Sequence, residues 1–507
     1  HIAATAIDLK EDPMATIEQQ NLFTWEDVEV RSDLDRLVLV RDHLPDERII
    51  QYLEVMRGKG RDDYPVRPMW NAVLAGVVYQ HPSIESLRRE LSRNPSLLQT
   101  CGFEVLPVQK RPTAELVRDS HSGRTRVLWS KPGEAYYAVP GSTNFSRFLA
   151  NVIELEESLG LISAMVPALR TQLMEVLQDF GQHLGYDGKA IDSHSTGQVN
   201  RQTGETSDPD ADWGKHETVG VDGRTGKPWK KIKSWFGYGL HLIAETRYEI
   251  PVAIHLTPAS HSEQLELRTM IHELMHESPQ LAERCRDFSA DRGLDSGETK
   301  ALLWDEYRIR PLIDTRELWR EERQAPDYDP SRPITRPLNA KSTDTIVYTE
   351  KGSVHCICPA TGEQRDLAFQ GFEADRDALK YRCPAAAYGL DCKGQAQCHR
   401  AGKVEPGEYG RIVRIKITEQ NRRIFTPTPH GSPSWRRGYN RRSALERING
   451  RIDNSFGFEN HFIRGKAKMQ TRIGLALAIM MAMALGHVTA GRREQMRSLV
   501  QPIPATG

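Results

Sequence analysis

Apolar residues recur at helical spacing in four stretches of the first part of the chain, at 33–42, 47–56, 68–79 and 83–91. Side chains three and four positions apart share one face of a helix, so each stretch can bury one side. A His-Pro turn precedes the last stretch, and Ser83 is a residue type that caps helix N-termini. We therefore expect an all-α domain at 26–150, after a disordered tail at 1–25.

Between 185 and 320 the pattern changes to short apolar runs separated by polar or glycine-containing segments. Short runs bounded by turn residues indicate buried strands, whereas longer amphipathic stretches indicate helices. The predicted order is strand, strand, strand, helix, strand, helix, strand, at 190–193, 236–243, 252–256, 262–275, 288–291, 297–304 and 310–314. This alternation predicts an α/β domain with a mixed sheet. The polar segment 195–233 is expected to be a mobile loop.

A proline-rich segment at 325–337 marks another change in composition, and β-like runs follow at 344–349 and 409–417. These features predict a β-rich insertion at 321–430, then the helical C-terminal part of the core at 431–490 and a flexible tail at 491–507. The most apolar run, 475–485, is shorter than the ~20 residues that cross a bilayer. We expect it to be a buried helix and expect no membrane partner.

The chain has 507 residues, with 68 Lys plus Arg and 68 Asp plus Glu, so its net charge favours no particular partner. Two basic clusters contain aromatic residues, at 226–235 and 435–442, a combination that suits phosphate contact and base stacking. The alternative for each cluster is a solvated charged surface. The candidate DNA-contacting residues in these clusters are Lys231, Lys233, Arg436 and Arg437. The N-terminus has no basic segment followed by an apolar core, so we expect a cytoplasmic protein.

Three carboxylates and two neighbouring residues form the candidate catalytic site. Asp192 and Asp291 each end a short apolar run, while Tyr439, Arg442 and Glu446 are spaced to share one helix face. Hard Mg²⁺ or Mn²⁺ ions take oxygen ligands, and a pair of them can stabilise both the attacking and the leaving oxygen of a phosphoryl transfer. The pattern predicts two such ions held by Asp192, Asp291 and Glu446.

This arrangement resembles the DDE transposases of bacterial insertion sequences, in the subgroup with a Tyr-x-x-Arg-x-x-x-Glu signature, and the resemblance covers most of the chain. It includes 235–251 as paired strands after the first aspartate, 257–262 as the turn before the next helix, and 290–296 as the second-aspartate motif. The family signature continues to a Lys, where this chain has Asp453.

The resemblance implies a ribonuclease H-like catalytic core and an enzyme that cuts and rejoins DNA at the ends of a mobile element. It implies double-stranded DNA as the partner, as terminal inverted repeats and as target, bound by a homodimer and contacted also by the helical domain. Tyr439 and Arg442 would contact phosphates near the cut end, and Arg447, Arg451 or Lys466 is a candidate to replace the missing cation. Asp453 keeps a second hypothesis open, a weak or inactive transposase-derived DNA-binding protein.

A third hypothesis rests on His272, Glu273 and His276, which form a His-Glu-x-x-His pattern. On a helix this pattern can hold zinc with the Glu as general base, and Glu298 lies at a suitable distance along the chain for a third ligand. The pattern is short enough to arise by chance, and the same helix has the spacing of a packing helix between two strands. A zinc protease is therefore the weaker alternative.

Five of the seven cysteines fall in the expected insertion, at Cys356, Cys358, Cys383, Cys392 and Cys398. Clustered cysteines in a reducing compartment predict a structural Zn²⁺, but these spacings differ from the usual paired Cys-x-x-Cys. A zinc site and a group of unligated thiols both stay open. Cys101 and Cys285 stand alone and are expected to be buried apolar residues.

Overall fold

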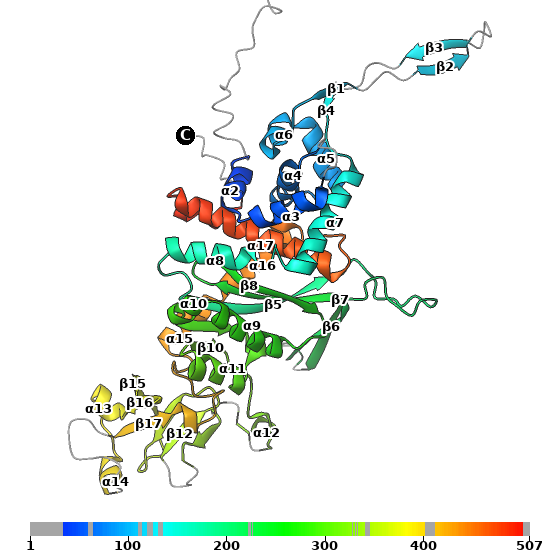
Figure 1. Cartoon of the computed structure of the whole chain (residues 1–507). Coiled ribbons are helices and arrows are strands. Elements are labelled where there is room, and N and C mark those ends of the chain that lie inside the picture. Colours follow the sequence, from blue (N-terminus) through cyan, green and yellow to red (C-terminus); the bar gives the residue numbers. More distant parts are fainter. Residues whose placement is uncertain are drawn as a thin grey trace, which may run out of the picture.

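The computed structural model describes residues 34–58, 64–109, 114–118, 125–129, 135–221, 225, 227–326, 328–329, 331, 333–339, 345–400 and 411–499. Figure 1 shows helices from the N-terminal part at one end, a central sheet with flanking helices, and a β-rich region at the other end. The protein is a mixed α/β chain, as predicted. The expected tail at 1–25 lies outside the described residues, as does the end of the tail expected at 491–507.

Helices make up most of the N-terminal part: α2 (Asp35–His43), α3 (Glu47–Arg57), α4 (Val66–Val78), α5 (Ile84–Arg93), α6 (Pro95–Cys101), α7 (Ser142–Leu159) and α8 (Met165–Val176). Ser83 caps α5 as predicted, since its hydroxyl accepts a hydrogen bond from the backbone N–H of Ser86 at 3.2 Å. Nearly every residue of α4 is buried, so α4 is the central helix of this part.

The N-terminal part is not purely helical, contrary to the prediction. Strand β1 (Pro107–Gln109) pairs with β4 (Ala135–Tyr137), and β2 (Ala114–Arg118) pairs with β3 (Thr125–Trp129), both antiparallel. Strands of three to five residues are too short for a two-residue period to stand out in the sequence. Their β-branched and aromatic residues nevertheless favour the extended pleated backbone.

The central sheet is mixed and contains β5 (His183–Asp192), β6 (Asp212–Val221), β7 (Pro228–Glu245), β8 (Ile250–Pro258), β9 (Asp287–Ala290) and β10 (Arg310–Ile313). The strand order is β10-β9-β5-β7-β6, and β8 also pairs with β7. Strands β5, β9 and β10 are parallel, while β7 is antiparallel to β5, β6 and β8. The carboxyl ends of β9 and β10 therefore point the same way as that of β5.

Two parts of the sheet differ from the prediction. Strand β5 begins at His183 rather than at Ala190, so the predicted strand is only its last part. The segment expected as a mobile loop contains β6 and the beginning of β7, which pair from Asp212↔Gly237 to Val221↔Pro228. This hairpin is largely exposed, so its strands have no buried apolar face that would have revealed them.

Helices α9 (Glu263–Glu277) and α10 (Pro279–Arg284) connect β8 to β9, and α11 (Gly297–Ala301) with a π-helical turn (Leu302–Glu306) connects β9 to β10. The C-terminal part adds α15 (Pro433–Asn440), α16 (Ser443–Phe456) and α17 (Lys466–Thr489). Helix α17 contains the most apolar run of the sequence. It is 24 residues long, and 89% of its most apolar window is buried by the protein. Figure 1 shows α17 between α2 and α8, so it is a core helix, as expected.

Between β10 and α15 lie two small antiparallel sheets. One contains β11 (Thr335–Pro337), β12 (Ile346–Thr349), β13 (Val354–Ile357) and β14 (Gln364–Asp366), and the other β15 (Ala368–Glu373), β16 (Ala378–Arg382) and β17 (Ile412–Lys416). Short helices α12 (Arg320–Arg323), α13 (Pro384–Tyr388) and α14 (Gln395–Arg400) accompany them. The sheets share an apolar cluster of their own, separate from the main core, which includes Ile346, Leu379, Ile415 and Phe425. We refer to residues 321–430 as the insertion.

Candidate active site

Asp187 and Asp291 lie side by side on neighbouring parallel strands. Strands β5 and β9 are in register at Gly185↔Ser289, and each aspartate is two positions further along its strand direction. Asp187 is in the middle of β5, whereas Asp291 directly follows β9 and accepts a hydrogen bond from the backbone N–H of Gly293. Parallel pairing therefore brings the two carboxylates to one place on the sheet.

Helix α16 crosses β5 and faces this pair of aspartates. Its Asn449 donates from Nδ2 to Asp187 Oδ2 at 2.8 Å, and Glu446 lies three positions earlier, on the same helix face. The helix can approach closely because residue 185 is a glycine. A Cβ at Gly185 would lie 3.1 Å from Leu445 Cδ1 and closer still to side chains of the sheet.

Asp187 lies in the combined field of several carboxylates. Burial raises its pKa, the positive charge of Arg442 opposes the rise, and the negative charges of Asp291, Glu263 and Glu446 add to it, which brings the pKa to about 6. The two predicted residues Asp291 and Glu446 both lie near enough to Asp187 for their charges to act on it.

Glu263 is a further acidic residue of this site that the sequence did not indicate. Glu263 is the first residue of α9. Burial raises its pKa, the charge of His216 opposes this rise, and the charge of Asp291 adds to it. A Cβ at Gly188, next to Asp187, would lie 2.6 Å from Glu263 Oε1, so the Glu263 side chain reaches β5 at this point. Acidic residues are common in the first turn of a helix because they stabilise it, so the sequence did not mark Glu263 as a site residue.

Arg442 lies among the carboxylates, at the start of α16. Its Nη2 is 3.1 Å from Glu446 Oε1, and its Cζ lies 6.0 Å from the centre of the Tyr439 ring. Burial disfavours the charged guanidinium, but Tyr439 and the acidic residues outweigh burial, so the pKa of Arg442 is raised. The Tyr439 ring stacks on Trp435, with centroids 4.6 Å apart. Tyr439 and Arg442 lie beside Glu446, but the single helix expected for the three residues is wrong, since α15 ends at Asn440 and α16 begins at Ser443.

The structure does not bring Asp192 to this site. Asp192 is five positions after Asp187 on β5, which corresponds to about 17 Å of strand. Because successive side chains of a strand alternate between faces, an odd separation also puts the two aspartates on opposite faces of the sheet. Asp192 is exposed, and its charge acts on His461. Asp187, rather than Asp192, therefore lies beside Asp291 and α16.

The other predicted cationic residues have different surroundings. Lys231 and Lys233 are exposed on β7 of the β6–β7 hairpin, and Arg436 and Arg437 are exposed on α15. Arg451 instead faces the protein: it ion-pairs with the carboxylate of Glu249 and donates to the Glu249 carbonyl at 3.0 Å. Four of the five cations are therefore free to meet a ligand at the surface, and the fifth is held by an internal acid.

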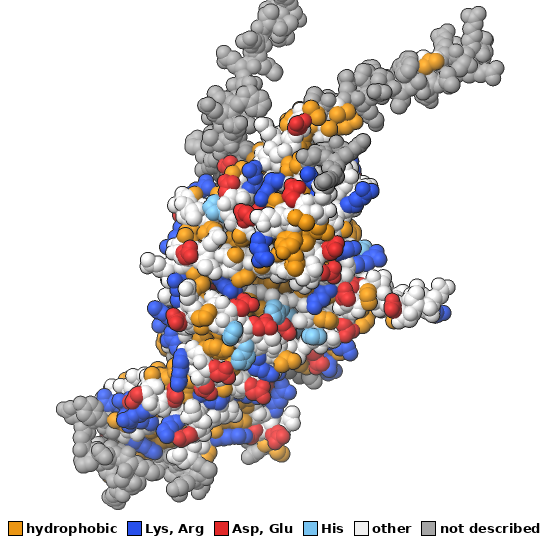
Figure 2. All heavy atoms as spheres, viewed as in Figure 1, with side chains coloured by type: hydrophobic (Ala, Val, Ile, Leu, Met, Phe, Trp, Pro, Cys, Tyr) orange, Lys and Arg blue, Asp and Glu red, His pale blue; other side chains and the backbone are white. Residues whose placement is uncertain are grey.

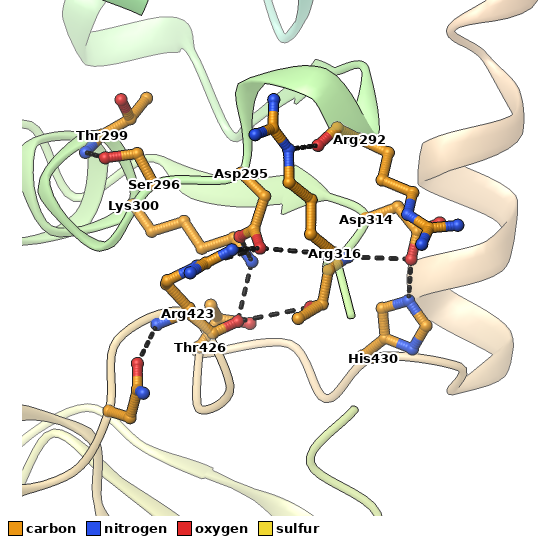
Figure 3. A network of polar contacts seen from close by, with 12 residues as sticks. Arg292, Asp295, Ser296, Thr299, Lys300, Asp314, Arg316, Arg423, Thr426 and His430 are labelled. Atoms are coloured by element: carbon orange, nitrogen blue, oxygen red, sulfur yellow. Dashed lines mark hydrogen bonds and ion pairs between the residues drawn. The ribbon is translucent and has the colours of Figure 1, made fainter. Parts of the chain in front are cut away.

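A buried ion-pair network joins the second-aspartate segment to the insertion (Figure 3). Asp295 accepts from Arg423 Nη2 and contacts Lys300 Nζ, both at 2.8 Å, and its side chain and that of Lys300 are 0% and 2% exposed. Figure 3 also shows His430 facing Asp314, with His430 Nε2 and Asp314 Oδ1 2.7 Å apart. These contacts link the part of the core that precedes the insertion to the segment that leads from the insertion back into the core.

The His-Glu-x-x-His pattern does not form a ligand set. His272 Nδ1 lies 2.9 Å from the Tyr307 hydroxyl, and Glu273 Oε2 lies 3.0 Å from His255 Nε2. The expected third ligand, Glu298, pairs with Arg268 at 3.1 Å. Figure 2 shows histidine and acidic side chains mixed on this face of the molecule. The helix is α9, whose apolar residues pack into the core, so the contacts favour a packing helix over a zinc protease.

Residues 183–482 match the transposase DDE domain family, and this match covers more than half of the chain. The chain therefore belongs to the transposase DDE domain family and is a transposase. No curated protein matches it. Among solved structures, it is similar to a piggyBac transposase synaptic complex with hairpin DNA, with 12% identity, a TM-score of 0.35, and coverage of 93% of this chain and 80% of that one. That structural likeness is too low to carry an argument about function.

Members of this family use divalent metal ions, and the donors at the site fit such ions. Asp187, Asp291 and Glu446 supply the hard oxygen ligands that Mg²⁺ and Mn²⁺ prefer. Beside them, Asn449 Oδ1 is buried and accepts no hydrogen bond from the described residues. Within the described residues no three acidic, His or Cys side chains are already gathered at metal-binding geometry. The cation that balances the carboxylates in this structure is Arg442.

Proposed function

We propose that this transposase is catalytically active and cuts and rejoins DNA at the ends of a mobile element, with Asp187, Asp291 and Glu446 as its catalytic carboxylates. The observation that carries the proposal is the position of Asp187, beside Asp291 across parallel strands and within the field of Glu446. Family membership gives the reaction class. Asp187 takes the role that the sequence pattern assigned to Asp192.

The chemistry needs charge stabilisation and positioning more than covalent catalysis. Two Mg²⁺ or Mn²⁺ ions held by the three carboxylates would activate the attacking hydroxyl and stabilise the leaving oxygen. The chain's own residues prepare this site: Asn449 orients Asp187 through its amide, and Glu263 adds negative charge that attracts cations. Arg442 offers a planar cation that suits a phosphate, and its stacking on Tyr439 limits its freedom.

The catalytic core in this proposal is ribonuclease H-like. Its support is the strand order, in which the antiparallel strands β5, β7 and β8 are followed along the chain by two strands parallel to β5, namely β9 and β10. Strand β6 is then an addition between β5 and β7. In such a sheet the first aspartate belongs in the middle of the central strand, which is where Asp187 lies.

The proposed DNA path leads outward from the carboxylates along the β6–β7 hairpin. Lys233 is directly opposite His216 in the antiparallel register, and Lys231 is on the same face two positions away. His216 acts on the pKa of Glu263, so this face of the hairpin begins beside the site. Arg436 and Arg437 extend the cationic surface on α15. The proposal includes double-stranded DNA, a homodimer on DNA, the helical domain at 26–150 as a further contact, and a bacterial insertion sequence as the element.

Cleavage of DNA that carries the element's ends, in the presence of Mg²⁺ or Mn²⁺, tests the proposal. Asp187→Asn, Asp291→Asn and Glu446→Gln should each abolish strand cleavage while DNA binding persists, because each removes one charge at nearly constant shape. Asp192→Asn is the matched control on the same strand and should cleave normally. If Asp187→Asn cleaves and Asp192→Asn does not, the assignment of the first carboxylate is wrong.

The rival hypothesis, a transposase-derived protein that binds DNA without cutting it, was motivated by the anion at Asp453. In the structure Asp453 Oδ2 lies 2.6 Å from Lys189 Nζ, so its charge is balanced by a lysine of β5. This contact weakens the argument that Asp453 makes the protein inactive. Wild-type protein that binds end-sequence DNA but leaves it uncut with either metal would favour the rival over the active enzyme.

A further inference from the structure

All five cysteines of the insertion line a single cavity of about 340 Å³. They come from separate segments around the cavity: Cys356 and Cys358 from β13 and its end, Cys383 from the end of β16, and Cys392 and Cys398 from the segment that leads into α14 and from α14 itself. All five are free thiols. Figure 1 shows α13 and α14 at the end of the insertion that is remote from the central sheet.

The sulfurs are near enough to influence one another. Burial raises the pKa of Cys392, and the charges of Cys358, Cys383 and Cys398 raise it further, against a backbone N–H that lowers it. Burial likewise raises the pKa of Cys356 to about 11; the charges of Cys398, Cys383 and Cys392 raise it further, and Arg411 lowers it. Each cysteine of the cavity therefore acts on at least one other.

The segment that carries three of these cysteines has almost no apolar core. From 383 to 398, Pro384 and Gly394 are the buried residues. Helices α13 and α14 have five and six residues, too few to be stable on their own. Small units with so little buried apolar surface usually depend on disulfides or a metal ion. Since the cysteines here are free, a metal ion is the remaining kind of cross-link.

Two of the sulfurs have the surroundings of thiolate ligands. The Thr361 hydroxyl and the backbone N–H groups of Ala360, Thr361 and Gly394 donate hydrogen bonds toward Cys358. The Gly394 N–H also acts on Cys392. Position 394 must be glycine for this approach, since a Cβ there would lie 2.9 Å from Cys358 Sγ. Backbone N–H groups that converge on sulfur favour the charged thiolate, the form that binds metals.

We propose that Cys358, Cys383, Cys392 and Cys398 bind one structural Zn²⁺ that holds the distal part of the insertion together, with Cys356 as a non-ligating neighbour. Four thiolates from four points of the fold match the tetrahedral preference of zinc. The thiols are not yet gathered to metal-binding geometry among the described residues, so side-chain rotation accompanies binding. Each bound thiol loses its proton to solvent, and no electron is transferred. The proposal is independent of the catalytic carboxylates.

The test is the metal content of the purified full-length protein, measured by elemental analysis. The wild type should contain one zinc per chain and little iron. Cys358→Ser, Cys383→Ser, Cys392→Ser and Cys398→Ser should each lose most of this zinc, whereas Cys356→Ser and the remote Cys285→Ser should retain it. A wild type without zinc, a wild type that binds iron in its place, or a Cys356→Ser variant that loses zinc while Cys358→Ser keeps it would overturn the proposal.

A second measurement on the wild type avoids dependence on variants that fail to fold. Thiol-reactive reagent should modify four additional cysteines per chain after a chelator removes the zinc, and protease should then cut within 383–398. The DNA-cleaving carboxylates are elsewhere, so zinc content and strand cleavage are separate readouts. Equal thiol reactivity with and without chelator would show that the cysteines are unligated and would contradict the proposal.

Discussion

Lys189 and Asp453 form an ion pair between β5 and α16, with Nζ and Oδ2 2.6 Å apart and side chains that are 17% and 28% exposed. Lys189 is two positions after Asp187 on the strand, and Asp453 is two helical turns after Glu446. The pair therefore lies next to the carboxylates, on the same face of β5. The pair consists of a lysine on the strand and an acid on the helix.

The exchange of Asp453 for an uncharged residue should release this lysine for DNA. Asp453→Asn is expected to raise DNA affinity at low salt and to steepen the salt dependence by about one counterion. Lys189→Ala should have the opposite effect on affinity, because it leaves Asp453 unpaired near the phosphates. Binding isotherms over a range of salt concentrations measure both.

The double exchange Lys189→Asp with Asp453→Lys provides the control for that pair. It restores the ion pair with reversed direction, so it should recover the stability that either single exchange loses, which we expect to be about 1 kcal/mol for a partly exposed pair. An unchanged salt slope in Asp453→Asn would mean that Lys189 does not reach DNA.

Asp187→Asn should stabilise the metal-free protein at neutral pH. The pKa of Asp187 is raised from 3.8 to about 6, so the folded state binds this proton more tightly than the unfolded state, and stability falls as pH rises from about 4 to about 6. An amide has no such dependence. The difference in unfolding free energy between variant and wild type should be near zero below about pH 3 and roughly 3 kcal/mol above pH 7.

Urea unfolding in the presence of a chelator, at several pH values, measures this difference. Other groups with raised pKa values, such as Glu245, affect both proteins equally and cancel. Added Mg²⁺ should stabilise the wild type and leave Asp187→Asn unchanged, because ligand binding stabilises the state that binds it. A constant difference across the pH range would argue that Asp187 ionises normally in the folded protein.

Arg442→Ala and Arg451→Ala should separate a DNA-binding cation from a structural one. Loss of Arg442 is expected to lower the steepness of the salt dependence by about one counterion and to weaken binding to cleaved ends. Arg451 is held by Glu249, which is 5% exposed in its side chain, so its loss should lower stability and leave the salt slope unchanged. Equal effects of the two variants on the salt slope would contradict the assignment of Arg442 to DNA binding and of Arg451 to stability.

Asp295→Ala should destabilise the joint between core and insertion. It leaves the Lys300 ammonium, 2% exposed, without its carboxylate, and the loss of one partner of a buried pair costs about 3–5 kcal/mol. Lys416→Ala, which breaks an exposed pair with Glu419, should change stability by less than about 1 kcal/mol. Chemical denaturation measures both, and similar small effects would show that the network is not essential to the joint.

The sequence predicted the parts of the fold whose period matches one buried face. The N-terminal helices and α9 have this helical spacing, while β7 to β10 were indicated by short apolar runs, since β9 and β10 are buried along most of their length. Strands β1 to β4 are too short for a period, and the exposed β6–β7 hairpin buries too little to show one. The mixed α/β class could be predicted from the sequence, but strands β1 to β4 and the β6–β7 hairpin could not.

In the candidate site, Asp291 and Glu446 were visible because each sits at the end of a regular pattern. Asp187 was missed because Gly185 and Gly188 flank it, and glycine lowers the apparent strand propensity of its neighbours. The structure gives the reason for both glycines: Leu445 of α16 and Glu263 of α9 occupy the space that their side chains would fill. The sequence contains one signal for the missed part of the strand. Leu184 and Tyr186 lie two positions apart and are both buried, so their alternation indicates that the strand begins before Asp187.

The contact between His430 and Asp314 also bears on how the chain folds. These residues are 116 positions apart, and the entropy of closing a chain rises with the logarithm of its length. An insertion that folds first around its own apolar cluster would bring its two ends together, so α16 would need to search only a short effective loop before it reaches β5. We therefore expect the insertion to speed the late assembly of the core, although it contributes no residue to the carboxylate cluster.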